Sequence, residues 1–198
     1  MAIEVKAFRS EQAQKYVDEL ADLRMRIFRD YPYLYDGSVE YEKTYLSRYF
    51  EAQDSVVFLV FNSSDAVIGA TTCIPLREEI PEIQKPFREG GLNVDEYFYF
   101  GESLLEKTYR GKGFGRLFFQ YREKEALRNP EIHYSCFCAL NRPSEHPLKP
   151  DNYRSLEPFW RNLGYQPQSG MYTSMGWKDI DKEKETAKKL QFWVKKLR

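Results

Sequence analysis

Apolar residues along the chain follow two periods, one typical of strands and one typical of helices. In residues 3–8, Ile3 and Val5 alternate with polar residues, which predicts a first strand. Residues 10–28 place apolar side chains three and four positions apart, and residues 41–50 repeat this spacing. We therefore expect two helices, each packing one apolar side against a sheet.

Further strands and helices are predicted up to the C-terminus. Residues 113–129 and 155–163 have helical spacing, and these helices should end at Pro130 and at Gly164, a residue that suits the C-cap. The predicted strands span residues 55–61, 66–76, 97–105, 132–140 and 170–177. Residues 62–65 are rich in turn-forming side chains, so the first two of these strands should form a hairpin.

The remaining segments are less regular. Residues 77–96 are charged and predict a connector with one or two helical turns between Pro81 and Gly90. Residues 141–152 contain three prolines, which predicts a loop. The apolar spacing in residues 189–197 fits both a strand and a helix, so periodicity leaves this last element open.

The order of these elements indicates a mixed α/β fold. The chain has 198 residues, and at about 150 residues per domain we expect a single domain over residues 1–198. Hydrophobic residues make up 42% of the chain and aromatic residues 16%. This content is sufficient for a packed core and excludes intrinsic disorder.

Charge and cysteine content narrow the function classes. Thirty basic residues balance thirty acidic ones, which argues against a nucleic-acid-binding protein, because such proteins need a basic surface. Three cysteines make a poor disulfide framework. The first thirty residues lack the apolar core of a signal peptide, and no apolar run approaches the roughly 20 residues that span a bilayer. We expect a cytoplasmic protein without membrane contact.

The segment with the clearest chemistry is a glycine-rich turn between a predicted strand and a predicted helix. It reads Arg110-Gly111-Lys112-Gly113-Phe114-Gly115 and is followed by a further basic residue at position 116. Glycines expose the backbone amides of a turn, and a helix N-terminus carries about half a positive charge. Such a turn suits a diphosphate, although a plain strand-to-helix turn also uses glycine.

Two other phosphate-binding motifs fit poorly. Residues 101–108 approach the P-loop pattern, but Glu106 stands where the second glycine is required, and its carboxylate would repel a phosphate. A dinucleotide-binding fingerprint needs a different glycine spacing from that of Gly111, Gly113 and Gly115, after an early strand.

Two motifs together resemble the GNAT superfamily of acyl-CoA-dependent N-acetyltransferases. The first, Arg110-x-x-Gly113-x-Gly115, is similar to the pyrophosphate-binding motif of that family. The second is similar to the short helix and the glycine–aromatic step after its fifth strand, and reads Phe159-Trp160-x-x-Leu163-Gly164-Tyr165. The element order also agrees across nearly the whole chain.

The resemblance implies a GNAT-like fold. It has a central, mostly antiparallel sheet of about seven strands, flanked by about four helices. The fourth and fifth strands, here residues 97–105 and 132–140, run parallel and splay apart, and acetyl-CoA lies in the gap. The family ends in a strand, which favours a strand over residues 189–197.

The resemblance also implies the residues that bind acetyl-CoA as cosubstrate. The pantetheine should pair with the backbone of the fourth strand, and the diphosphate should lie on the glycine-rich turn. The implied binding residues are Leu104, Leu105, Glu106, Arg110, Gly111, Lys112, Gly113, Phe114, Gly115 and Arg116. A backbone amide near Leu104 or Leu105 would polarise the thioester carbonyl.

Glu102 is the predicted catalytic base, which takes a proton from the attacking amine. Strand alternation places it on the side of Phe98, Phe100 and Leu104, and such an apolar setting suits a carboxylate for base catalysis. The competing interpretation is a structural ion pair between Glu102 and a nearby basic residue.

The general acid of the family is a tyrosine four residues before the glycine that ends the short helix. This chain has Trp160 there, and an indole cannot protonate the leaving thiolate. Tyr153, in the loop before the helix, is the preferred substitute. Tyr165, Tyr172 and solvent are the alternatives.

The resemblance places acceptor recognition on the connection between the first two helices and on the long loops over the sheet. The predicted acceptor-binding residues are Tyr31, Tyr33, Tyr35 and His146. No metal site is expected, because in a strand His133 points away from Cys136 and Cys138.

The sequence thus predicts an enzyme that transfers an acetyl group from acetyl-CoA to a primary amine by direct attack. The acceptor is a small molecule or a peptide amine. The alternative is a catalytically inactive acyl-CoA-binding regulatory or scaffold protein, which the Trp160 substitution favours. The sequence leaves a homodimer open.

Overall fold

The computed structural model describes residues 3–143 and 145–198. The strands are β1 (Glu4–Arg9), β2 (Val56–Phe61), β3 (Val67–Pro75), β4 (Tyr97–Leu105), β5 (Tyr134–Leu140), β6 (Gln166–Lys178) and β7 (Glu185–Lys196). The α-helices are α1 (Val17–Phe28), α2 (Val39–Glu51), α3 (Pro81–Glu89), α4 (Phe114–Ala126) and α5 (Glu157–Asn162). No helix in these described ranges is both long enough and apolar enough to cross a membrane.

All seven strands belong to one sheet with the order β1-β2-β3-β4-β5-β7-β6. Every neighbouring pair is antiparallel except β4 and β5, which are parallel. The predicted mixed α/β fold is therefore confirmed, including the seven strands and the parallel fourth and fifth strands. The C-terminal segment, which periodicity left open, is the strand β7.

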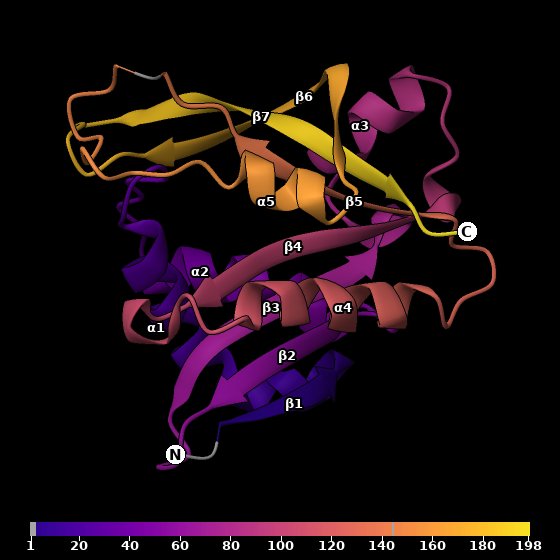
Figure 1. The fold of residues 1–198 in the computed structure, drawn as a ribbon, viewed down its shortest axis with the longest axis horizontal. Coiled ribbons are helices and arrows are strands. Elements are labelled where there is room, and N and C mark those ends of the chain that lie inside the picture. The colour runs from indigo at the N-terminus through magenta and orange to yellow at the C-terminus, as the bar shows by residue number, and fades with distance from the viewer. Residues whose placement is uncertain (1–2, 144) are drawn as a thin grey trace.

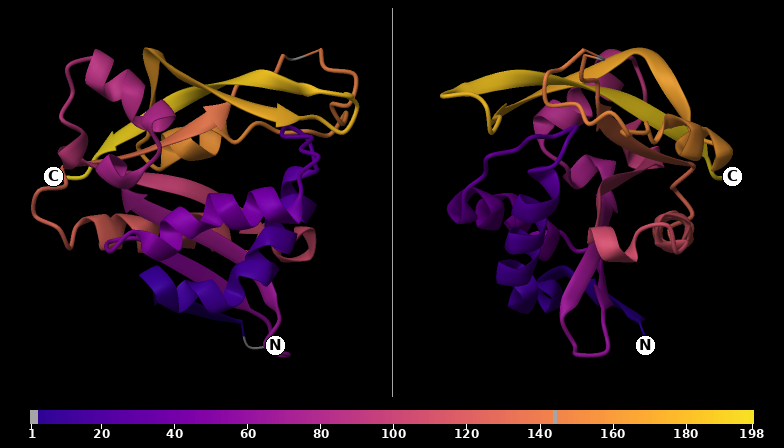
Figure 2. Two further views of the ribbon diagram at one scale, coloured as in Figure 1. Left: turned by 180° about the vertical axis from the view of Figure 1, so that it is seen from behind. Right: turned by 60° about the vertical axis from the view of Figure 1, so that its left-hand side comes forward.

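Helices cover both faces of the sheet (Figures 1 and 2). One apolar layer joins the sheet to α1, α2 and α3, with Leu20, Leu46 and Phe87 fully buried in it. A second layer on the opposite face joins the sheet to α4 and α5 through Phe119 and Phe159. The described residues form five α-helices where about four were expected, because the charged connector contains α3.

The first predicted helix divides into two kinds of helix. Residues Ser10–Tyr16 form a 3₁₀ helix, and the α-helical hydrogen bonding starts only at Val17. A 3₁₀ segment is common at the N-terminal end of an α-helix because its turn is tighter. Strand β6 also begins four residues before the predicted strand, and its pairing with β7 is irregular between Pro167 and Tyr172.

Strands β4 and β5 separate along their length. They pair only over three positions, from Tyr97 with Tyr134 to Tyr99 with Cys136. Beyond Tyr99, β4 continues beside β3, whereas β5 turns away with β7, so the two strands diverge in Figure 1. The expected splay of the fourth and fifth strands is confirmed, and it opens the sheet in front of α4.

A β-bulge interrupts β4 just where the strands part. Between Thr71 and Cys73 of β3 there is one residue, whereas between their partners Ser103 and Phe100 of β4 there are two. The extra residue shifts the alternation of side chains by one position. The prediction that Glu102 shares a face with Phe100 is therefore wrong, because Phe100 packs against α4 and Glu102 points toward α1 and α2.

Candidate functional site

The glycine-rich turn adopts a backbone that only glycine takes readily. Gly111 has φ +76° and Gly113, the N-cap of α4, has φ +91°. Both glycines are exposed, and a side chain built on either would meet nothing within 4 Å. The glycines are therefore required by the backbone conformation and not by crowding, and the space over the turn is open.

The turn presents unpaired backbone amides to this open space. The first amides of a helix have no acceptor within the helix. Across residues 3–143 and 145–198, no group accepts a hydrogen bond from the amides of residues 111–116. Arg110, Lys112 and Arg116 are exposed around them. The free amides, the helix dipole and the basic side chains together would suit an anion.

The backbone of Leu105 faces the gap between β4 and β5. The Glu106 amide donates to the Ile68 carbonyl of β3 at 3.0 Å. Backbone groups of neighbouring residues in an antiparallel strand point to opposite sides, so those of Leu105 point away from β3. The Leu105 carbonyl accepts a 2.9 Å hydrogen bond from the Nε of Arg110. One end of the gap is thus connected to the glycine-rich turn.

On the other face of β4, Glu102 belongs to a buried ionic triad with Arg24 and Glu42. Arg24 Nη1 lies 2.5 Å from Glu102 Oε2, and Arg24 Nε donates to Glu42 Oε2. The Tyr45 hydroxyl donates to Glu102 Oε2 at 3.3 Å. Glu102 was expected in an apolar setting, but it forms the ion pair that was the competing interpretation.

One oxygen of Glu102 nevertheless has no partner. The residue is only 5% exposed, and within the described part of the chain no group donates to Oε1. A buried carboxylate oxygen without a donor is costly, so it marks a position where a ligand can supply one. Burial raises the pKa of Tyr45, and the nearby Glu102 raises it further, so this phenol stays a neutral donor.

Glu102 lines a cavity of about 90 Å³ between α1, α2 and strands β4 to β7, here called the tyrosine cavity. Half of its lining residues are aromatic. Its lining residues are Arg24, Phe28, Tyr33, Tyr35, Tyr41, Tyr45, Tyr99, Gly101, Glu102, Cys138, Met175, Gly176, Trp177 and Leu190. Gly101 is required there because a side chain would collide with the Tyr49 hydroxyl.

The thiol in the tyrosine cavity is not activated. Burial raises the pKa of Cys138 to about 12, although its hydrogen bond with Tyr99 acts in the opposite direction. The two side chains lie 3.1 Å apart. Cys138 is therefore a neutral thiol at physiological pH and not a nucleophile.

The predicted acceptor-binding residues fall into two groups. Tyr33 and Tyr35 line the tyrosine cavity with Glu102. Tyr31 does not, because its ring packs against Tyr153 at 4.6 Å and against His146 at 6.1 Å. These last three residues form an outer aromatic cluster on the loops beside the cavity. Burial raises the pKa of Tyr153, which keeps its phenol protonated.

Arg142 joins the three loops around this region. Its guanidinium donates to Asp179 Oδ2 at 2.9 Å and to the Tyr33 carbonyl at 2.9 Å. Lys188 Nζ also lies 3.3 Å from Asp179. Burial by itself would raise the pKa of Asp179, but its bonds with Arg142 and Lys188 lower it below the usual value. The ion pairs fix one wall of the tyrosine cavity.

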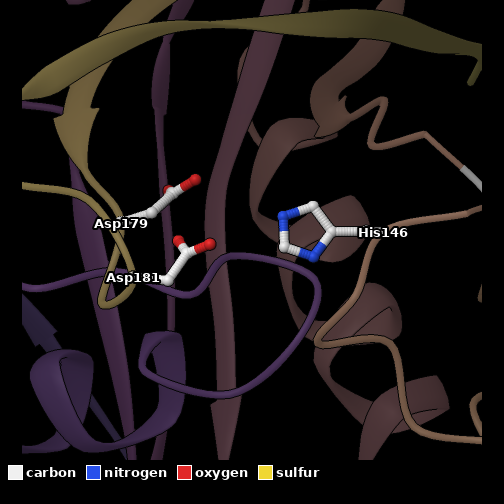
Figure 3. Close-up of side chains that lie close together, drawn as sticks. All are labelled: His146, Asp179 and Asp181. Carbon is white, nitrogen blue, oxygen red and sulfur yellow. The ribbon is translucent and has the colours of Figure 1, made fainter.

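Figure 3 shows His146 facing Asp179 and Asp181, whose ligand atoms lie within 4.8 Å of one another. This arrangement could hold a metal ion, but its charges are already compensated. Asp179 pairs with Arg142 and Lys188, and Asp181 lies 3.3 Å from Lys182. His146 Nδ1 accepts from the Leu148 amide at 3.2 Å. The cluster is therefore better described as a network of ion pairs.

Trp160 and the two cysteines of β5 lie in packed surroundings. Trp160, in α5, packs edge-on against Phe137 and Trp193, with ring centroids 5.1 Å away in each case. Cys136 and Cys138 are free thiols of β5. Trp160 does not line the tyrosine cavity.

Sequence reasoning missed Arg24, Glu42 and Tyr45. Arg24 falls at the helical spacing of the apolar residues of α1, and it is buried with them. Glu42 holds a similar position in α2 and is fully buried. A charged residue at the buried spacing of a helix is the signal that could have found both, since such a charge needs a partner.

Comparison with protein-family models gave no match, and neither did comparison with curated proteins. Solved structures do match. A GNAT-family acetyltransferase from Staphylococcus aureus Mu50 has a TM-score of 0.63 at 13% identity, over 100% of both chains. A GCN5-related N-acetyltransferase from Kribbella flavida has a TM-score of 0.59 at 11% identity, over 98% of both chains.

A third match was solved with its cofactor acetyl-CoA. This protein, a proposed acetyltransferase from Salmonella typhimurium, has a TM-score of 0.58 at 10% identity, over 100% of this chain and 95% of its own. At these identities the matches establish architecture. The strand order, the splayed parallel pair and these matches lead to one conclusion: the chain has the GNAT acetyltransferase fold.

Proposed function

We propose that the protein transfers an acetyl group from acetyl-CoA to a primary amine. The observation that carries this proposal is the set of unpaired amides at residues 111–116, at the start of α4 and beside the gap between β4 and β5. This is the arrangement that a diphosphate attached to an extended chain requires. The acetyl-CoA bound to the Salmonella protein of the same fold supports it.

The residues present fit coenzyme A in two respects. The amides and basic side chains from Arg110 to Arg116 would hold the diphosphate, with Gly113 allowing close backbone approach. The backbone from Leu104 to Glu106 would pair with the pantetheine, because the Leu105 peptide faces the gap. The Leu105 amide would then steady the oxyanion that develops on the thioester carbonyl.

Glu102 would accept the proton of the acceptor ammonium. Oε2 is held by Arg24 and Tyr45, which leaves Oε1 as the proton-accepting atom. The neutral amine then attacks the thioester carbonyl carbon and a C–N bond forms. The nitrogen loses its remaining excess proton to solvent, and the C–S bond breaks to release coenzyme A as a thiolate. Proton transfer at Oε1 contributes about 10²- to 10⁴-fold to such a reaction.

Tyr153 would return a proton to the leaving thiolate. Its phenol is protonated at neutral pH and lies on the loop that precedes α5. The ring of Tyr153 packs edge-on against that of Tyr31, with centroids 4.6 Å apart. Tyr31 and His146 would thus support the proton donor from the acceptor side.

The second candidate function is an acyl-CoA-binding protein without catalysis. Trp160 favours it, because the residue stands where the family places a proton donor and packs, half-buried, from α5 against the core. The ionic triad and the tyrosine cavity favour the enzyme, since a pure binding protein needs neither.

The two candidate functions can be distinguished by an assay. It measures the free thiol that is released from acetyl-CoA in the presence of a mixture of primary amines. The enzyme should release thiol only when an amine is present, and it should be stabilised by coenzyme A. A protein that is stabilised by coenzyme A but releases no thiol with any amine would be the binding protein. A protein that coenzyme A does not stabilise at saturating concentration would contradict both.

A further inference from the structure

The tyrosine cavity has a composition that selects its ligand. Half of its lining residues are aromatic, and its charged lining residues are Glu102 and Arg24. Arg24 lies over the Tyr45 ring at 3.9 Å from the centroid and over the Phe28 ring at 5.1 Å. The cavity therefore combines surfaces that attract cations with a buried carboxylate.

The charges of the buried ionic triad do not cancel. Glu42 and Glu102 share the single guanidinium of Arg24, so the triad has a formal net charge of −1. Arg48 approaches the other face of the Tyr45 ring at 4.1 Å, but it already pairs with Glu79 at 2.9 Å. Arg122 donates to the Glu102 carbonyl at 3.4 Å, but its guanidinium lies over the Phe100 and Phe119 rings in the layer of α4. Within the triad, Oε1 of Glu42 and Oε1 of Glu102 both lack a donor, and of these two residues only Glu102 lines the cavity.

Size sets a second limit on the ligand. A cavity of about 150 Å³ holds benzene, and a water molecule occupies about 30 Å³ of liquid. At about 90 Å³ the tyrosine cavity is smaller than a cavity that holds benzene, so it favours a narrow, unbranched group over an aromatic ring.

We infer that the acceptor is a cation that enters the tyrosine cavity as an unbranched alkylammonium group, with its nitrogen at Glu102 Oε1. This inference rests on the proposed function for the reaction, but the binding of an alkylammonium ion does not depend on it. The aromatic rings contact the methylene groups, and the ammonium supplies the missing donor and the missing positive charge. An α-amino acid is excluded, because its carboxylate would lie beside Glu102.

An amine series tests the selectivity. Thiol release is measured with propylamine, 1,3-diaminopropane, benzylamine and glycine at equal concentrations of acetyl-CoA. We expect kcat/KM for the two linear amines to exceed that for benzylamine and glycine at least tenfold. Benzylamine or glycine used as well as propylamine would overturn the inference, even though the proposed acetyl transfer would then stand.

A binding experiment tests the charge without any turnover. Propylammonium chloride should raise the Tm of the wild-type protein, and 1-propanol, which has the same chain without the charge, should not. Equal stabilisation by the two compounds, or none by propylammonium, would overturn the inference. An absence of thiol release in the amine series, together with specific propylammonium binding, would contradict the proposed function alone.

Glu42→Gln tests the uncompensated charge, because it neutralises the triad and leaves Glu102 in place. We expect at least tenfold weaker binding of propylammonium by this variant, with binding of coenzyme A unchanged. Glu79→Gln is the matched control, since Glu79 is also buried and paired with an arginine but does not line the cavity. Equal losses in both variants would overturn the assignment of the charge to the triad. The comparison with 1-propanol needs no substitution, so the test does not depend on the folding of either variant.

Discussion

At the scale of single residues, the position of Glu102 depends on one inserted residue in β4. Without the bulge, simple alternation would turn this carboxylate toward Phe100 and α4. With the bulge, it reaches Arg24 and the tyrosine cavity. Gly101 allows this conformation next to the Tyr49 hydroxyl. The bulge thus sets the direction of this side chain, just beyond the point where β4 and β5 part.

Replacing Glu102 with glutamine should remove the proton acceptor and preserve the shape of the cavity. We expect kcat to fall by about 10²- to 10⁴-fold, with the affinity for coenzyme A unchanged. Steady-state thiol release and calorimetric titration measure the two quantities. Glu79→Gln, a buried carboxylate outside the cavity, serves as the control. Full activity in Glu102→Gln would exclude this residue as the base.

Replacing Tyr153 with phenylalanine should remove the proposed proton donor while the ring still packs on Tyr31. We expect kcat to fall about 100-fold with little change in the KM of the amine. Tyr31→Phe is the matched control from the same ring pair. Equal kcat values in wild type and Tyr153→Phe would leave solvent or another tyrosine as the source of the proton.

At the scale of elements, the turn before α4 and the loops beside the tyrosine cavity differ in structure. The turn is open, exposed and unpaired, as a site for an anion must be. The loops are tied by buried ion pairs through Arg142 and Asp179, and β-bridge pairing joins Tyr35 to Asp179. We therefore expect substitutions in the turn to affect ligand binding and substitutions in the loops to affect stability.

Gly113→Glu should abolish stabilisation by coenzyme A, because it puts a carboxylate on the amides of the turn. At a concentration 100 times its Kd, coenzyme A adds about 2.7 kcal/mol, or roughly 5–10 °C in Tm for a chain of this size. Gly91→Glu is the matched control, since Gly91 also has a positive φ and open surroundings. A full shift in folded Gly113→Glu would exclude the turn as the site.

Asp179→Asn should destabilise the protein at neutral pH by about 3 kcal/mol, because it leaves Arg142 and Lys188 without their anion. The pKa of Asp179 is lowered in the folded state, so its contribution is complete above the unfolded value of about 3.9 and is lost as the pH falls through the folded value. Urea unfolding at pH 7, 5 and 3 should show the difference from wild type shrinking toward pH 3.

Asp181→Asn provides the comparison for this experiment. Asp181 lies in the same turn but is exposed, and its partner Lys182 lies 3.3 Å away. We expect a change within about 0.5 kcal/mol at every pH. A difference between wild type and Asp179→Asn that stays constant from pH 7 to pH 3 would show that the carboxylate does not act through its charge.

At the scale of the whole molecule, more of the fold than of the candidate site could be predicted from the sequence. The strand over residues 97–105 was predicted to the residue, because its apolar run is bounded by polar segments. The glycine-rich turn is a local feature, so its open conformation was also predictable. The splay of β4 and β5 followed from the family resemblance and not from periodicity, since pairing between strands leaves no local signal.

The tyrosine cavity could not be predicted, because its walls come from segments far apart in the sequence. Tyr33, Tyr99 and Trp177 meet only when the sheet and the helices have packed. The bulge that redirects Glu102 is likewise invisible to alternation, which assumes an uninterrupted strand. The single-domain organisation of residues 1–198, the cytoplasmic location and a homodimer stay predictions.

The most direct test of the account is a crystal structure of the protein with coenzyme A at saturating concentration. We predict the diphosphate on the amides of residues 111–116, with the pantetheine passing beside Leu105 between β4 and β5. Coenzyme A bound on another surface, with the turn before α4 vacant, would contradict the account, as would a complete absence of the ligand.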